Sequence, residues 1–274
     1  MNRICKFLAA VLTLALLLCG CSGSEDTLTV LIPKIGKADC SILKQDSNTL
    51  MIDCGEAENT DTILAALRQN GITKLDTLII THFDKDHVGG AAQILHSLTV
   101  GQVLEPDYTP ENPESESYTS YRQALEETGT PVTKVLNFLD LTLGTATLTV
   151  TGTGGTLYSK NMDNNNSLLV TVSHAGNTLL FAGDIEKQRI RNVLEDGVDT
   201  VDFLKVPHHG VYNSALPEFF GSLEMQYAVI TCSNKNPADT ETLEALDALG
   251  VKTYETVDGD IKVVSSPNSI RIYQ

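Results

Sequence analysis

The sequence contains no tryptophan, and aromatic residues make up only 5% of its 274 residues. Basic residues are also scarce: 19 lysines and arginines face 35 aspartates and glutamates, which gives a formal net charge of −16. Such a chain lacks the broad basic surface with which proteins coat DNA or bind anionic lipid. The composition therefore disfavours a non-specific DNA-coating protein.

Cysteine is present at six positions, but their spacing matches neither a disulfide framework nor a zinc knuckle. Half of them fall in the first 21 residues, which leaves an odd number, Cys40, Cys54 and Cys232, in the rest of the chain. Cys54 and Cys232 lie in apolar, strand-like surroundings. We expect buried free thiols.

One long apolar run, residues 7–18, follows the basic residues Arg3 and Lys6. It is short for a membrane anchor but suits the core of a signal peptide. The run ends in Leu18-Cys19-Gly20-Cys21, which resembles a bacterial lipobox. We therefore predict a signal peptide over 1–20, lipidation of Cys21, a flexible tether over 21–26, and an extracytoplasmic protein anchored by lipid to the cell membrane. An ordinary secretory signal is the alternative.

The remaining residues, 27–274, have the length of one α/β domain or of two small ones. Residues 105–118 are rich in Pro, Glu and Ser without periodicity, which predicts an exposed excursion. Apolar periodicity predicts strands at 27–32, 41–43, 49–52, 75–80, 145–151, 167–173, 178–182, 201–206 and 227–231, and helices at 60–70, 91–98, 186–194 and 239–249. We expect two sheets packed face to face, with helices outside.

Four candidate metal ligands fall within six residues: His82, Asp84, Asp86 and His87. They follow an apolar strand, and Gly89-Gly90 next to them allows a sharp turn into a helix. Unpaired carboxylates are costly to bury, whereas in a loop at a strand end they can converge on a cation. A mixture of imidazole and carboxylate suits zinc, manganese or iron. A solvated polar loop is the alternative without function.

Three other predicted strands also end in ionisable residues. Asp53 follows one strand, Asp184 follows a second, and the pair His208-His209 follows a third. Any one of these would be weak evidence. Together they predict a site along one edge of a β-sandwich.

These motifs resemble the metallo-β-lactamase superfamily over residues 27–274. The usual signature of that superfamily is His-x-His-x-Asp-His, and this chain has His82-x-Asp84-x-Asp86-His87. The aspartate in the second place resembles the hydrolase domains of ComEC-like DNA-uptake proteins. The runs 164–170, 181–184, 205–210 and 233–237 add to this resemblance.

The resemblance implies a four-layer αββα sandwich with two divalent metal ions, Mn²⁺ or Zn²⁺ with Mg²⁺ as a further option. His82 and Asp84 would hold the first ion. Asp86, His87 and one histidine of the 208–209 pair would hold the second, and Asp184 would bridge both. The catalytic candidates are Asp86, Asp184 and His209.

Within the pair, His208 is the preferred ligand, which leaves His209 to contact the scissile phosphate or to protonate the leaving group. The sequence leaves their order open. Asp53 would orient a metal ligand from behind. Asn166 and Lys205 would support ligands or contact substrate, and Lys160 and Lys235 fall in loops predicted beside the site.

The superfamily's third histidine at the first ion has no match in this sequence. Its place falls at 163–166, so Asp163, an asparagine or water would complete the ligand set. His174 falls in a predicted hairpin turn away from the active edge, and His96 lies on a predicted helix as a surface or packed residue. Exchanging imidazole for carboxylate shifts the preference from zinc toward manganese or magnesium.

The expected function is metal-dependent hydrolysis of DNA, nucleotides or another phosphodiester at the outer cell surface. Two ions about 3.5–4 Å apart would share the attacking hydroxide. One alternative is hydrolysis of a small-molecule ester, lactone or phosphodiester. A second alternative is a non-catalytic surface binding protein on the same scaffold.

Overall fold

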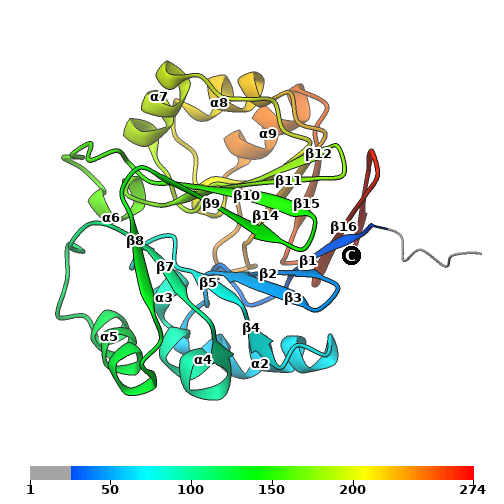
Figure 1. Ribbon diagram of the computed structural model, residues 1–274. Helices are drawn as coiled ribbons and strands as arrows, with labels where there is room; N and C mark the ends of the chain where they lie inside the picture. Colours follow the sequence, from blue (N-terminus) through cyan, green and yellow to red (C-terminus); the bar gives the residue numbers. More distant parts are fainter. Residues whose placement is uncertain (1–25) are drawn as a thin grey trace, which may run out of the picture.

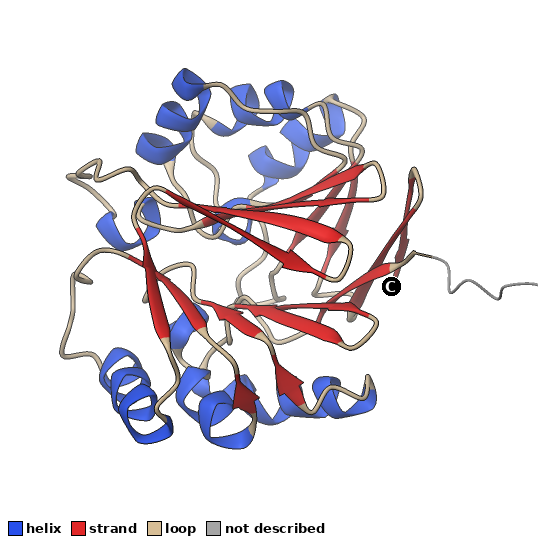
Figure 2. Cartoon of the chain, viewed as in Figure 1, coloured by secondary structure: helices blue, strands red, loops and turns tan. Residues whose placement is uncertain are grey.

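The structure, a computed structural model, describes residues 26–274. The predicted signal peptide and Cys21 lie outside the described residues, as does nearly all of the predicted tether. The elements stack in four layers: helices, sheet, sheet and helices (Figure 1; Figure 2). This arrangement confirms the predicted αββα sandwich. Across 26–274 no helix combines the length and the apolar character needed to span a bilayer.

The first sheet carries both ends of the described chain. Among residues 26–274 it contains eight strands, in the order β17 (Ser269–Tyr273), β16 (Ile261–Ser266), β1 (Leu28–Ile32), β2 (Ser41–Gln45), β3 (Asn48–Ile52), β5 (Thr77–Ile79), β7 (Val103–Pro106) and β8 (Val132–Val135). The pairs β3–β5, β5–β7 and β7–β8 are parallel. The helices of the lower layer in Figure 1 cover the outer face of this sheet.

The second sheet is built from the middle and later part of the chain. Its seven described strands run in the order β15 (Lys252–Glu255), β14 (Tyr227–Ile230), β13 (Phe203–Lys205), β12 (Asn177–Phe181), β11 (Leu169–His174), β10 (Ala146–Thr151) and β9 (Phe138–Leu143). The pairs β12–β13, β13–β14 and β14–β15 are parallel.

The helices connect the parallel strands and cover the two outer faces. In the lower layer of Figure 1 lie η1 (Ala57–Asn59), α2 (Thr60–Gln69), α3 (Lys85–Val88), α4 (Ala91–Ser97) and α5 (Glu116–Thr128). The other layer and its connections contain α6 (Met162–Asn165), α7 (Lys187–Asp196), η2 (Pro207–Gly210), α8 (Leu216–Leu223) and α9 (Thr240–Ala248).

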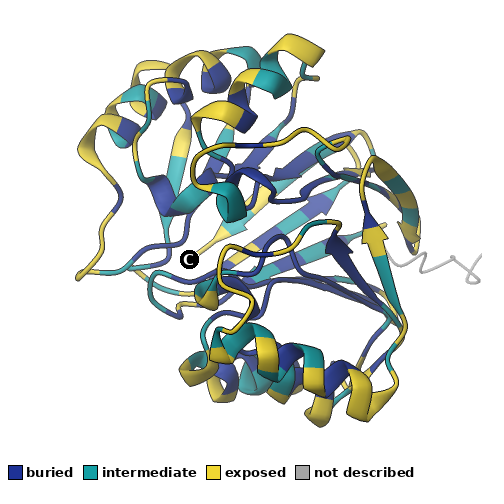
Figure 3. Cartoon of the chain, turned by 90° about the vertical axis from the view of Figure 1, so that its left-hand side faces the viewer, coloured by how far each residue is buried: buried dark blue, intermediate teal, exposed yellow. Residues whose placement is uncertain are grey.

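Three hydrophobic layers match these interfaces. One cluster, which includes Leu43, Val170 and Phe181, fills the space between the sheets. A second packs β-strands against the lower helices, and a third packs the other sheet against α7, α8 and α9. Figure 3 shows the exposed residues concentrated on the outer surfaces of the helices. Cys54 and Cys232 are buried and free, as predicted, and Cys40 is buried and free as well.

The carboxyl ends of the parallel strands of both sheets meet at one edge of the sandwich. Strand β3 pairs with β5 and strand β12 with β13, so the residues that follow all four strands emerge on the same side. The Leu168 N–H donates to the Thr81 carbonyl at 2.9 Å, which links the two sheets at this edge.

Two predictions need correction. The expected strand at 75–80 divides into β5 and the short β4 (Lys74–Leu75), which pairs with β6 (Thr99–Val100), because Asp76 turns aside and accepts the Thr49 N–H at 2.8 Å. The expected excursion at 105–118 is irregular only between β7 and α5. Glu105 belongs to β7, is 1% exposed, and accepts hydrogen bonds from the Tyr121 hydroxyl and from Arg122.

Candidate metal centre

The first group of site residues follows β3 and β5. Asp53 comes directly after β3 with a left-handed backbone, φ 60°, a conformation that costs free energy in non-glycine residues and gathers at functional sites. Its N–H donates to the Ile79 carbonyl at 2.9 Å, which ties it to the end of β5. His82 lies three residues beyond that end and is fully buried.

The short helix α3 presents the rest of the His82–His87 motif. Asp84 precedes its first residue and remains 44% exposed, while Asp86 and His87 lie within it. The backbone N–H of Cys54 donates to the His87 carbonyl at 2.7 Å. This hydrogen bond holds the helix against the end of β3.

Asp184 reaches the site from the second sheet, three residues after β12. Gly183 makes this possible: its φ is 54°, and a Cβ at this position would lie 2.8 Å from Ser167 Cβ. The Asp184 N–H donates to the Ser167 hydroxyl at 3.1 Å. The chain therefore turns tightly past Ser167 to direct Asp184 into the site.

The paired histidines follow β13 in η2, and both have left-handed backbones, with φ 50° at His208 and 54° at His209. The two rings consequently diverge. His209 turns inward and is 1% exposed, whereas His208 is 20% exposed and lies 3.4 Å from Glu186 through Nδ1.

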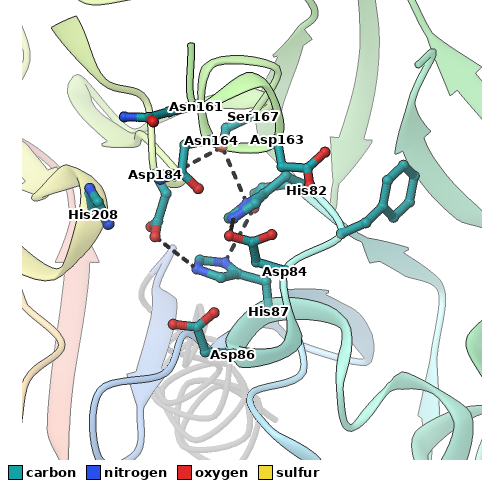
Figure 4. Close-up of polar contacts among 12 residues, drawn as sticks. His82, Asp84, Asp86, His87, Asn161, Asp163, Asn164, Ser167, Asp184 and His208 are labelled. Atoms are coloured by element: carbon teal, nitrogen blue, oxygen red, sulfur yellow. Dashed lines mark hydrogen bonds and ion pairs between the residues drawn. The ribbon is translucent and has the colours of Figure 1, made fainter. Parts of the chain in front are cut away.

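The buried side chains converge on Asp184. Asp184 Oδ2 lies 3.2 Å from His87 Nε2 and 3.2 Å from His209 Nε2. His209 Nε2 is also 3.3 Å from Asp86 Oδ2. On the other side, His82 Nε2 is 3.7 Å from Asp84 Oδ2, and the rings of His82 and His87 have centroids 4.0 Å apart (Figure 4).

Two of these groupings could each hold a cation at the Nε2 side of the imidazoles. One contains His82, His87 and Asp184, and the other contains Asp86, His87 and His209. A third grouping, Asp39 and Asp53 at the Nδ1 side of His87, lies behind the first two.

The Nδ1 atoms of the three buried imidazoles all face hydrogen-bond acceptors. His87 Nδ1 lies 2.8 Å from Asp53 Oδ2, and His209 Nδ1 lies 3.1 Å from the Thr231 carbonyl. His82 Nδ1 lies 3.2 Å from the Thr81 hydroxyl and 3.2 Å from the Ser167 hydroxyl. For His87 and His209 the acceptors favour a proton on Nδ1, so a neutral ring carries its lone pair on Nε2.

The Nε2 atoms of these rings form no hydrogen bond in the described chain, although two of them lie 3.2 Å from Asp184 Oδ2. Within 26–274, the Nε2 atoms of His82, His87 and His209 and the Oδ1 atom of Asp184 are buried without a hydrogen bond. Buried polar atoms in proteins are nearly always satisfied, so several orphans that face one another indicate a ligand. The donor set therefore fits divalent metal ions.

The electrostatics of the protein chain alone show the same concentration of charge. Burial opposes protonation of His209, but the carboxylates of Asp184 and Asp39 outweigh it and raise its pKa to about 9. Burial likewise opposes protonation of His87, yet Asp184 and Asp53 raise its pKa well above the usual value. Burial disfavours the Asp184 carboxylate, but the two imidazoles lower its pKa well below the usual value. A metal ion would replace these protons.

The order of the histidine pair differs from the preferred interpretation of the sequence. His209 contacts Asp86 and Asp184, whereas His208 contacts Glu186 at the rim. The backbone dihedral angles decide this order, and they leave no trace in the sequence. The geometry thus favours His209 as the ligand.

Asp39 belongs to the site and was missed by the sequence analysis. It lies in the connection between β1 and β2, is 5% exposed, and accepts a hydrogen bond from the Thr231 hydroxyl. It also forms an ion pair with Lys205, which is itself buried. Lys205 is therefore turned inward and supports Asp39, which in turn lies 3.4 Å from His209 Nδ1.

The other site residues predicted from the sequence lie at the margin of the cluster around Asp184 or away from it. Asn166 donates to the Met162 carbonyl and lines a cavity of about 270 Å³ together with Tyr108 and Tyr158. His174 contacts Ser265, and His96 pairs with Glu127 on the surface. Both histidines lie away from the site.

Comparisons with known proteins agree with this geometry. Residues 34–230 match the model of the family described as the metallo-beta-lactamase superfamily. ComE operon protein 3 of Bacillus subtilis (strain 168) is 29% identical over 182 residues, which cover 64% of this chain and 22% of that protein. Recombination protein 2 of Haemophilus influenzae is 23% identical over 219 residues, which cover 78% of this chain and 25% of that protein. The chain thus spans about a quarter of the length of these relatives or less.

Solved structures show the same fold. The metallo-beta-lactamase fold protein YhfI from Bacillus subtilis matches with a TM-score of 0.56 and 12% identity, over 91% of this chain and 100% of that chain. Igni18, a metallo hydrolase from Ignicoccus hospitalis, matches with a TM-score of 0.54 and 16% identity, over 90% of this chain and 99% of that chain. Human tRNase Z, short form, matches with a TM-score of 0.50 and 11% identity, over 89% of this chain and 98% of that chain. At sequence identities this low, the structural similarity shows a shared fold only.

Proposed function

The chain belongs to the metallo-beta-lactamase superfamily, and on that premise we propose that it is a metal-dependent phosphodiesterase acting on DNA or nucleotides. The observation that supports this proposal is the cluster of His82, His87, His209 and Asp184, in which all three buried Nε2 atoms lack a hydrogen bond within the described chain. The relatives named ComE operon protein 3 and Recombination protein 2 favour a nucleic-acid substrate.

Two divalent ions held at such a centre would lower the pKa of a water molecule and neutralise charge on a phosphate. His82 and Asp84 would hold one ion, and Asp86, His87 and His209 the other. Asp184 would contact both. Other residues of the chain orient these ligands.

Asp53 has that orienting role toward His87. Its Oδ1 accepts the Thr81 N–H at 2.8 Å, and its Oδ2 accepts from the Thr81 hydroxyl and from His87 Nδ1. A carboxylate fixed by this many donors cannot swing into the centre. It therefore holds His87 with Nε2 forward.

His208 is the residue placed to meet a substrate. It is partly exposed, lies next to His209, and is outside the groupings that could hold an ion. Burial lowers its pKa despite the neighbouring Asp184 and Glu186. We assign it to contact the phosphate or to protonate the leaving group.

A small-molecule ester, lactone or phosphodiester is the second candidate substrate, and the charge of the rim favours it. A cavity of about 230 Å³ beside the centre is lined by Asp84, Glu111, Asn161, Asp163, Asn164 and Glu186. Such an acidic rim repels a long polyanion more than a small or uncharged molecule.

The test is cleavage of labelled single- and double-stranded DNA by the full chain in detergent, with added Mn²⁺. We expect cleavage that depends on Mn²⁺ and is abolished in Asp184→Ala, while Asp61→Ala, which removes an exposed carboxylate on α2, retains it. Full activity of Asp184→Ala would contradict the proposal. If the protein binds metal and hydrolyses small esters alone, the second candidate is favoured. If it binds metal and turns over no substrate, a binding protein is favoured.

We also propose that the protein is anchored outside the cytoplasm through lipid on Cys21. The support is the lipobox-like sequence after a basic and apolar leader. Mass spectrometry of the N-terminal peptide from membranes tests this, with Cys21→Ser as the control. We expect a diacylglyceryl-modified cysteine and release of the variant from the membrane fraction.

A further inference from the structure

The run 163–166 occupies the place where the first ion needs another ligand, and most of its side chains have other partners. Asp163 accepts the Glu111 N–H through both carboxylate oxygens, at 3.1 and 3.2 Å. Asn165 accepts the N–H groups of Glu186 and Arg189 and so holds the start of α7. Asn166 donates to the Met162 carbonyl.

Asn164 differs from its neighbours. Its Nδ2 donates to Glu186 Oε1 at 2.8 Å, and its Oδ1 is buried without a hydrogen bond in the described part of the chain. Because Glu186 can only accept, the contact fixes which end of the amide is the NH₂ group. The carbonyl oxygen must then face away from Glu186, and Figure 4 shows the Asn164 amide directed toward the space between Asp184 and His82.

Glu186 acts as a clamp in this arrangement. Its other oxygen accepts a hydrogen bond from Asn161 Nδ2, so both asparagines are held by their NH₂ groups. The Asn164 side chain therefore has one orientation imposed on it, with its oxygen aimed at the centre.

The His82 side of the centre is short of donors. His82 is fully buried with an orphan Nε2. The residues grouped with it are Asp184 and His87, of which His87 is assigned above to the other ion, and Asp84 lies 3.7 Å away. A zinc ion takes four ligands, and manganese or magnesium about six, so this side needs more oxygen atoms than two carboxylates supply. Asn164 Oδ1 is a further orphan atom, and its amide is directed toward this side of the centre (Figure 4).

Building on the proposed function, we propose that Asn164 Oδ1 is a ligand of the ion at His82, and that Glu186 is the residue that positions it. The resulting donor set has one imidazole and otherwise oxygen. Such a set favours manganese or magnesium over zinc.

The test is metal binding to the full chain in detergent, measured without reference to activity. Native mass spectrometry and Mn²⁺ titration give the number of ions, and electron paramagnetic resonance detects the coupling between two Mn²⁺ ions. The variants are Asn164→Ala, the double variant Asn164→Asp with Glu186→Gln, and Asn161→Ala, the matched control that loses the other hydrogen bond to Glu186. The double variant keeps an oxygen ligand at 164 and restores its contact with 186, with donor and acceptor exchanged. Circular dichroism establishes folding of each.

We expect two ions and a coupled signal in the unaltered chain and in Asn161→Ala. We expect one ion without coupling, or a second ion bound about 10–100-fold more weakly, in Asn164→Ala. We expect two ions in the double variant Asn164→Asp with Glu186→Gln. Two ions at unchanged affinity in Asn164→Ala would overturn the inference and leave the proposed function standing. If Asn164→Ala fails to fold, a folded double variant Asn164→Asp with Glu186→Gln that holds only one ion overturns it. Fewer than two ions in the unaltered chain would instead contradict the two-metal proposal itself.

Discussion

The Asp53 carboxylate lies behind the His87 ring: its Oδ2 is 2.8 Å from Nδ1, while Asp184 lies 3.2 Å from Nε2 on the opposite side. His87 is thereby held between a carboxylate that orients it and a carboxylate that shares the centre with it. The first contact sets the tautomer on which the second depends.

Replacing Asp53 with asparagine should weaken metal binding. An amide NH₂ group at the Oδ2 position would face His87 Nδ1 and favour the tautomer with its proton on Nε2, where a metal must bind. We expect affinity to fall about 10–100-fold, measured by calorimetric titration with Mn²⁺. Asp202→Asn is the matched control, because Asp202 accepts the Thr178 N–H far from the centre. Equal affinities in the two variants would contradict the assigned role.

Substitution of the paired histidines should separate their roles. His209→Ala should lose an ion, because Nε2 of this residue faces Asp86 and Asp184. His208→Ala should keep both ions and lower kcat about 10²–10⁴-fold, the usual contribution of a general acid or base. Metal content and kcat measured on the same samples check this, and loss of metal from His208→Ala alone would reverse the assignment.

The metal-free chain should lose stability as the pH rises. The pKa of His209 is raised from its ordinary 6.5 to about 9. Its stabilising contribution is therefore complete below pH 6.5 and disappears as the pH rises through about 9. Thermal unfolding of the metal-free chain between pH 6 and 10 should show this loss of stability. The loss should be smaller in His209→Gln.

The same protonation should oppose metal binding. An ion needs the neutral imidazole, so the apparent affinity should rise across this pH range, with release of protons on binding. Titrations in buffers that differ in ionisation enthalpy measure the protons released. An affinity independent of pH would show that His209 is not a ligand.

Gly183→Ala should be more destabilising than Gly71→Ala. Both glycines have left-handed backbones, with φ of 54° and 66°, but a Cβ at Gly71 meets nothing within 4 Å, whereas one at Gly183 would lie 2.8 Å from Ser167 Cβ. We expect a loss of about 1 kcal/mol at Gly71 and about 1–3 kcal/mol more at Gly183. Urea unfolding of the two variants checks the difference.

Much of the architecture could be predicted from the sequence because strands with apolar periodicity end in ionisable residues. Asp53, His82 and Asp184 all stand at such ends, and the pattern brings them to one edge. Asp39 gives no comparable signal, since it lies in a connection without periodicity. Backbone hydrogen bonds with Asp86 and Gly55, both distant in the sequence, hold it at the site.

Other features depend on three-dimensional geometry that the local sequence does not encode. The inward turn of His209 follows from two consecutive left-handed residues, and the inward turn of Lys205 follows from its ion pair with Asp39. Glu105 was assigned to an exposed excursion because of its neighbours in sequence. Its burial depends on Tyr121 and Arg122 of α5, more than a dozen residues away.

The donors of the centre come from both sheets: His82, Asp86 and His87 follow β5, while Asp184 and His209 follow strands of the second sheet. Ions coordinated by both sets of residues would cross-link the two sheets of the sandwich. Because ligands that bind only the folded state stabilise it by mass action, the free energy of unfolding would then depend on the concentration of metal around the protein. A chelator would destabilise the contact between the two sheets as well as abolish the proposed hydrolysis.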